Sequence, residues 1–94
     1  MDGMLKNIQL ENLRSEINEI DNQLLNLLQK RQQVSIKIGE YKKQNNLPIF
    51  DSTREIKLLD RLTKLNMESV FKLDNDFIKE TWVNIMNYSK KQQK

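Results

Sequence analysis

The fold of this 94-residue chain is decided by one stretch, LENLRSEINEIDNQLLNLLQKRQQVSIKIGEYKKQ (residues 10–44). Its apolar residues recur at alternating spacings of three and four, which is the period of one face of an α-helix. The members of this apolar stripe are Leu10, Leu13, Ile17, Ile20, Leu24, Leu27, Leu28, Val34 and Ile38. The pattern predicts one long N-terminal helix over about residues 5–44, about 60 Å in length.

Two cations, Arg31 and Lys42, lie on or beside the apolar stripe. A charge that is buried without a partner is costly. Arginine and lysine on long helices usually bury only their aliphatic stems and keep the charged group in water. These two side chains therefore either reach solvent in that way or bind an anion.

The composition of the whole chain favours an all-α fold, because the 94 residues include only two glycines and one proline. Pro48 disfavours helical geometry at the residue before it and so ends the first helix. A second helix is predicted over about residues 52–66, and a third over about residues 75–92, where Asp74 and its neighbours offer N-cap oxygens. Ninety-four residues are the length of a single domain, residues 1–94.

The absence of two reactive residue types limits the chemistry. The chain has no cysteine and no histidine, which excludes disulfides, Cys/His zinc sites, thiol nucleophiles and histidine bases. The net charge of +3 is mildly basic and mixed, and no basic cluster is interleaved with aromatic residues as in nucleic-acid binders. The basic residues near the C-terminus, Lys90, Lys91 and Lys94, are typical of a helix end.

No segment has the pattern of a membrane or export signal. No apolar run approaches the roughly 18 residues that span a bilayer. The first residues are not followed by the apolar core of a signal peptide. We therefore expect a cytoplasmic protein with neither a membrane nor a nucleic acid as its partner.

Helix geometry predicts a two-fold dimer. The long helix cannot bury its stripe along its whole length against two short helices, so part of the stripe should meet a second copy. Arg14 lies seventeen residues before Arg31, about 25 Å along the axis, and cannot join Arg31 and Lys42 within one straight helix. If two copies cross antiparallel near residue 25, Arg14 of one chain comes close to Arg31 and Lys42 of the other.

Polar residues at the ends of the two shorter helices also break the pattern. Ser52 and Glu55 match a capping box, which is a sufficient structural reason for Glu55. Arg54 in the first helical turn opposes the helix dipole, so another interaction is expected to hold it. Ser89 and Gln93 continue an apolar face, where they either line a polar cavity or mark a frayed C-terminus.

Together these residues resemble the all-helical, AroQ-type chorismate mutase family. The resemblance covers nearly the whole chain, from Leu13-Arg14 through Gly39, Pro48 and Leu58-Leu59 to Gln93. Its specific part is the ordered set Arg14, Arg31, Lys42, Asp51, Arg54, Glu55, Ser89 and Gln93. The resemblance implies a three-helix protomer in an interlocked homodimer with two shared active sites. It also implies the rearrangement of chorismate to prephenate, on the route to phenylalanine and tyrosine, without a metal or a cofactor.

The resemblance also implies a role for each residue of this set. Arg31 and the partner chain's Arg14 bind the two substrate carboxylates, and Ser89 adds a hydrogen bond to one of them. Lys42 and Gln93 face the ether oxygen. Glu55 receives the ring hydroxyl, with Asp51 and Arg54 supporting that end of the site. The implied catalytic residues are Lys42, Gln93, Arg31 and Glu55. Some relatives carry a glutamate at the Gln93 position, which must be protonated before it can donate.

Other functions stay open at this point. An isochorismate-pyruvate lyase has the same fold, although the Asp51-x-x-Arg54-Glu55 stretch favours the mutase. A non-enzymatic helical dimerisation or regulatory module predicts that Arg14, Arg31 and Lys42 all reach solvent. A DNA-binding dimer would need an exposed basic face. The chain is either a free-standing enzyme or the N-terminal part of a bifunctional one.

Overall fold

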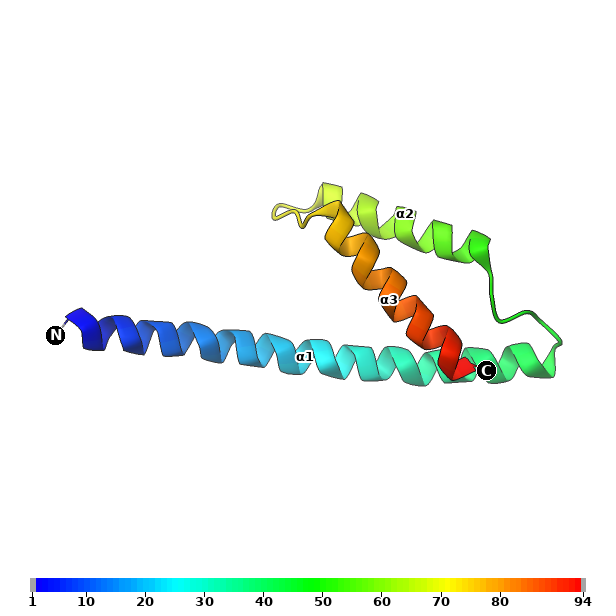
Figure 1. The fold of residues 1–94 in the computed structure, drawn as a ribbon, viewed down its shortest axis with the longest axis horizontal. Coiled ribbons are helices and arrows are strands. Elements are labelled where there is room, and N and C mark those ends of the chain that lie inside the picture. Colours follow the sequence, from blue (N-terminus) through cyan, green and yellow to red (C-terminus); the bar gives the residue numbers. More distant parts are fainter. Residues whose placement is uncertain (1, 94) are drawn as a thin grey trace. The chain divides into compact units, whose positions relative to one another are not determined.

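The computed structural model describes residues 2–93, and its regular structure is helical (Figure 1). The helices are α1 (Asp2–Gln44), α2 (Ser52–Glu68) and α3 (Asn75–Gln93). No strand occurs in this part of the chain, which confirms the predicted all-α class with a long N-terminal helix. None of these helices is both long and apolar enough to cross a bilayer. The chain forms two compact units that divide between Gln33 and Val34.

The first unit, up to Gln33, is the N-terminal part of α1. Its apolar stripe is open to solvent, with residues between 45% and 60% exposed. These residues are Leu13, Ile17, Ile20, Leu24, Leu27 and Leu28. A single helix has no core of its own, and most helices in proteins depend on packing of their apolar face for stability. The single chain thus leaves uncovered the face that its sequence marks for burial.

The second unit, from Val34 onward, has its core between α2 and α3, which pack side by side (Figure 1). Leu58, Ile78 and Met86 are buried there. Four other apolar residues are half-buried, namely Leu59, Leu62, Trp82 and Ile85. Ile56, Leu65 and Phe77 are also apolar but are at least half exposed. Two helices in contact cover only a narrow strip of each other, and these three residues lie outside it.

The end of α1 is set by Asn46 rather than by Pro48 alone. Asn46 has a φ of 55°, the left-handed conformation that ends many helices. The Leu47 N–H donates to the Lys42 carbonyl at 2.8 Å, and the Asn46 N–H donates to the Lys43 carbonyl at 3.4 Å. This pair of bonds is the Schellman motif, which satisfies carbonyls left over at a helix end. Asparagine is suited to the position because it tolerates left-handed geometry.

The N-termini of both shorter helices are capped by aspartates. Asp51 has extended backbone geometry, and its Oδ1 accepts the Arg54 N–H at 3.0 Å. The predicted capping box between Ser52 and Glu55 is therefore wrong, because Ser52 is already the first helical residue and Asp51 holds the cap position. Asp74 plays the expected part for α3, where its Oδ1 accepts two backbone N–H groups at 2.8 and 3.2 Å.

The turn between α2 and α3 is organised by one buried side chain, Asn66, which is 8% exposed. Its Nδ2 donates to the Leu73 carbonyl at 2.7 Å and to Asn75 Oδ1 at 3.2 Å. Its Oδ1 accepts the Leu73 N–H at 2.8 Å. Asn66 thus supplies the partners of a loop backbone that would otherwise lack them, and it fixes where α3 begins.

We predict that Asn66→Ala destabilises the chain, because the part-buried backbone N–H and carbonyl of Leu73 lose their partner. A typical intramolecular hydrogen bond contributes about 0.5–1.5 kcal/mol. The matched control is Asn84→Ala, an exposed asparagine of α3. Urea unfolding followed by circular dichroism should give a lower midpoint for Asn66→Ala than for Asn84→Ala. Equal midpoints would show that the turn does not depend on Asn66.

Candidate functional site

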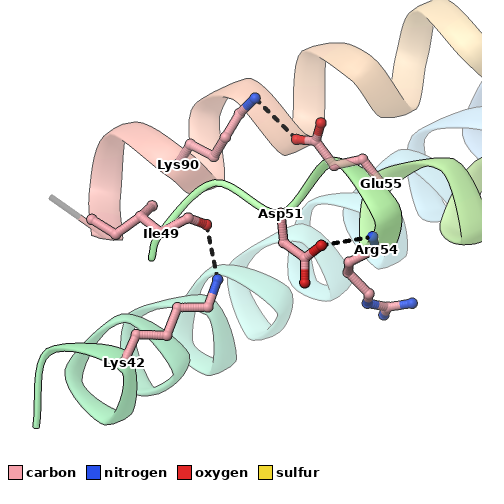
Figure 2. Close-up of polar contacts among 6 residues, drawn as sticks. All are labelled: Lys42, Ile49, Asp51, Arg54, Glu55 and Lys90. Carbon is pink, nitrogen blue, oxygen red and sulfur yellow. Dashed lines mark hydrogen bonds and ion pairs between the residues drawn. The ribbon is translucent and has the colours of Figure 1, made fainter. Parts of the chain in front are cut away.

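The candidate site lies in the second unit, where the C-terminal part of α1, the start of α2 and the end of α3 supply polar side chains. Figure 2 shows six of the residues concerned, from α1, the connecting loop, α2 and α3. They are Lys42, Ile49, Asp51, Arg54, Glu55 and Lys90. Four of these belong to the set that the sequence analysis named. The other two, Ile49 and Lys90, are partners that the structure adds.

Lys42 projects from the last turn of α1 toward the loop that leads to α2 (Figure 2). Its Nζ donates to the Ile49 carbonyl at 2.9 Å, and the residue is half-buried. An ammonium group has three N–H donors, so this bond leaves donors for a ligand. The carbonyl holds the charged group in place without neutralising it.

The start of α2 carries Asp51, Arg54 and Glu55. Asp51 uses one carboxylate oxygen as the helix cap. The Arg54 side chain is exposed and extends away from Glu55 (Figure 2). We expected a side-chain interaction to hold Arg54 against the helix dipole. The first turn of α2 is instead fixed by the Arg54 backbone N–H, which donates to the Asp51 cap.

Glu55 is joined to the far end of the chain by an ion pair with Lys90. The Lys90 Nζ lies 2.9 Å from Glu55 Oε1, and the two side chains are only 28% and 25% exposed. The same ammonium lies 4.7 Å from the centre of the Phe50 ring, within cation–π range. The interpretation of Lys90 as an ordinary basic residue of a helix end is thus incomplete. Its partner is 35 positions earlier, so no local pattern could indicate it.

The end of α3 is anchored on α1 through Gln93. Its Nε2 donates to Ser35 Oγ at 2.9 Å, and both residues are buried. A Cβ built on Gly39 would lie 3.0 Å from the Cα, Cβ and Cγ of Gln93, so any larger residue would require Gln93 to shift by a few tenths of an ångström. Gln93 Oε1 is buried without a hydrogen-bond partner. Gln93 is therefore ordered and packed, which answers the question of a frayed C-terminus.

Ser35 is a functional candidate that the sequence analysis missed. The signal was its register, since it lies four residues before Gly39 and seven before Lys42, on one face of the helix. Ser89 is also buried and makes a polar interaction. It lies one turn before Gln93 on the same face of α3.

Two of the three arginines of the predicted set, Arg14 and Arg31, belong to the first unit. Arg14 is exposed and pairs with Glu11 at 2.8 Å, a surface contact of little energetic weight. Arg31 is half-buried and also makes a polar interaction. A simple dimerisation module would leave Arg14, Arg31 and Lys42 all in solvent. In the structure Arg14 is exposed, whereas Arg31 and Lys42 are half-buried.

The second unit thus gathers an ammonium, an amide, a hydroxyl and a carboxylate from three helix ends. Such groups bind and orient a polar ligand by charge and hydrogen bonds, and they include no nucleophile activated by a base. Within residues 2–93 no three His, Cys, Asp or Glu side chains come together as metal ligands. The arrangement suits a reaction in which holding the substrate is the main task.

Comparisons with known proteins agree with this chemistry. A family model for chorismate mutase type II matches residues 13–94. The chain is 40% identical over 60 residues to a bifunctional chorismate mutase/prephenate dehydratase of Aquifex aeolicus, over 64% of this chain and 17% of that protein. It is 38% identical over 60 residues to a chorismate mutase of Methanocaldococcus jannaschii, over 64% of this chain and 61% of that protein.

One solved structure is similar over nearly the whole chain. It is a conserved hypothetical protein of Pyrococcus furiosus, 36% identical, with a TM-score of 0.73. The match covers 92% of this chain and 96% of that one. The chain spans less than two thirds of the length of the two curated relatives described above.

We predict that Gly39→Ala destabilises the chain although alanine favours helices. Alanine gains about 1 kcal/mol over glycine in a helix interior. At position 39 the new methyl group would meet the backbone and side chain of Gln93 at 3.0 Å, and such overpacking costs about 1–3 kcal/mol. Gly3→Ala is the matched control in α1, because its methyl group would meet nothing within 4 Å.

Thermal unfolding followed by circular dichroism compares the two variants. Gly39→Ala should unfold below the parent chain, while Gly3→Ala should match or exceed it. A Gly39→Ala variant as stable as Gly3→Ala would contradict the close approach of α3.

Proposed function

The chain belongs to the chorismate mutase type II family, and from this membership we propose that it converts chorismate to prephenate. The observation that carries the proposal is that the family match, residues 13–94, contains the whole set of candidate residues. The reaction is an intramolecular Claisen rearrangement, so it needs no nucleophile, metal or proton transfer. The cytoplasm is the proposed site of action.

The proposed mechanism is orientation combined with electrostatic stabilisation. Chorismate is a flexible dianion that must be held in a compact, chair-like shape, which is a problem of entropy and orientation. Negative charge develops on the ether oxygen as its C–O bond breaks, and fixed donors stabilise that charge. Lys42 and Gln93 are the proposed donors. The amide of Gln93 has two N–H groups, and Ser35 takes only one of them.

The remaining residues hold the rest of the substrate. Glu55 accepts a hydrogen bond from the ring hydroxyl, and Ser89 donates to a carboxylate. Arg31 binds a carboxylate through the planar fork of its guanidinium, which matches carboxylate geometry. Asp51 and Arg54 shape the end of the site near Glu55. This assignment is supported by the half-buried position of Glu55 and the buried positions of Ser89 and Gln93.

The second carboxylate is bound by Arg14 of a partner copy. The support for this homodimer is the uncovered stripe of α1, whose leucines and isoleucines are 45–60% exposed in the single chain. Burying one such side chain fully stabilises by about 1.5–3 kcal/mol. Two copies that cross antiparallel near residue 25 cover each other's stripe and bring the partner's guanidinium to the site.

An assay of chorismate consumption by absorbance tests the proposal, with isochorismate as the second substrate. Turnover of chorismate to prephenate is the expected result. Release of pyruvate from isochorismate, without chorismate turnover, would instead identify the lyase. No turnover of either substrate would contradict an enzymatic role.

We further predict that two inactive variants restore activity when they are mixed. Arg14→Ala and Arg31→Ala should each lose most activity alone. In a mixed dimer, one site regains both arginines because each is supplied by a different chain. Random mixing after unfolding and refolding should restore about a quarter of wild-type activity, since half of the dimers are mixed and each has one good site.

A second mixture is the control for this experiment. Arg31→Ala and Lys42→Ala remove residues that act in the same chain's site, so their mixed dimer has no complete site. No recovery is expected. Recovery in both mixtures, or in neither, would exclude a site shared in this way.

The role of Gln93 predicts how activity depends on pH. An amide donates without titrating, so wild-type kcat/KM should stay nearly level from about pH 6 to about pH 8. A glutamate at the same position would be mostly ionised over this range, which lies well above the ordinary glutamate pKa. In Gln93→Glu only the protonated carboxyl can donate, so activity should fall as the pH rises through the pKa of the new group. Gln92→Glu is the control, because Gln92 is exposed.

The measurement is kcat/KM as a function of pH for the three proteins. Gln92→Glu should follow the wild type. A wild-type kcat/KM that collapses over this range, or a level profile for Gln93→Glu, would contradict the proposal that Gln93 donates to the ether oxygen.

A further inference from the structure

We propose that Lys90 is a positioning residue, which holds the Glu55 carboxylate in the orientation that accepts the substrate hydroxyl. This inference rests on the proposed function and adds a residue to it. Lys90 lies in the last turn of α3, and Glu55 lies in the first turn of α2. The pair therefore joins two helix ends across the site (Figure 2).

The geometry of the pair differs from that of an ordinary surface ion pair. The Nζ to Oε1 distance is 2.9 Å, and about three quarters of each side chain is covered. The pair of Arg14 and Glu11 on α1 is a contrast, since its side chains are 62% and 68% exposed. Covered charges are screened less by water and salt, so the Lys90 contact restrains Glu55 more firmly.

Phe50 also contacts the Lys90 ammonium. The ring centre is 4.7 Å from Nζ, so the cation has two partners, an aromatic face and a carboxylate. Phe50 directly precedes the Asp51 cap, which ties the ring to the start of α2. The Lys90 side chain, which has four rotatable bonds, is thus restrained by two contacts.

The arrangement leaves Glu55 able to act. An ionised carboxylate has two acceptor oxygens, and Lys90 occupies Oε1. The other oxygen remains for a hydroxyl donor. Lys90 also stands next to Ser89 and three residues before Gln93, so a single turn of α3 supplies all three groups. Without Lys90 the Glu55 carboxylate could rotate, and the hydroxyl would lose a fixed acceptor.

A double-mutant cycle on kcat/KM tests the inference. Lys90→Met removes the charge and keeps the length of the side chain. It should lower kcat/KM by about tenfold to about a hundredfold, the scale of a misplaced group. In a Glu55→Gln background the same change should cost little more, because the group that it positions is already altered. Lys90→Arg should restore most of the activity.

Three further measurements separate positioning from folding. Lys91→Met, the exposed neighbour, should keep wild-type kcat/KM and have nearly the same unfolding midpoint as Lys90→Met. Phe50→Leu removes the ring face and should give a smaller loss of kcat/KM that also vanishes without Lys90. If Lys90→Met does not fold, Phe50→Leu takes its place in the cycle with Glu55→Gln.

The outcomes are distinct. Chorismate turnover by the wild type, with losses at Lys90 that depend on Glu55, supports the inference. Turnover by the wild type with full activity of Lys90→Met, or with equal losses in both backgrounds, overturns the inference and leaves the proposed function intact. A wild type that does not convert chorismate overturns the proposed function, and this inference with it.

Discussion

The structure depends on an apolar stripe that its own chain does not cover. α1 is 43 residues long, while α2 and α3 have 17 and 19, and the core between those two shorter helices is small. The leucines and isoleucines in the first 33 residues are exposed in the single chain. Because helix formation in water is weakly favoured without packing, a second copy is the natural source of the missing contacts. In the proposed homodimer the same association also completes the proposed site, so folding and the proposed activity share one requirement.

Within the second unit, the site is built by contacts that fix the helix ends. Asn66 sets the turn before α3, Asp51 sets the start of α2, and Gly39 lets Gln93 approach α1. Each contact therefore fixes the position of a helix end that carries candidate site residues. Buried polar groups of this kind are stabilising only when they are hydrogen-bonded, and Gln93 Oε1 is the exception.

Periodicity predicted the three helices, and composition predicted that the chemistry would lack thiols and imidazoles. The Asp74 cap could also be predicted, because its sequence signal is local. Contacts between residues far apart in the sequence could not be predicted. Ser35 bonds a residue 58 positions away, and Lys90 pairs with one 35 positions away. The capping box failed for a different reason, since Asp51 and Ser52 are both good caps and a one-residue difference in the helix start decides between them.

The central claim is that two copies of the chain together form the active unit. Sedimentation equilibrium over a range of concentrations, including those used to measure chorismate turnover, tests it most directly. We expect a mass of twice 11.3 kDa wherever the chain is active, with helicity lost as the dimer dissociates. A folded, active species of 11.3 kDa would contradict the account.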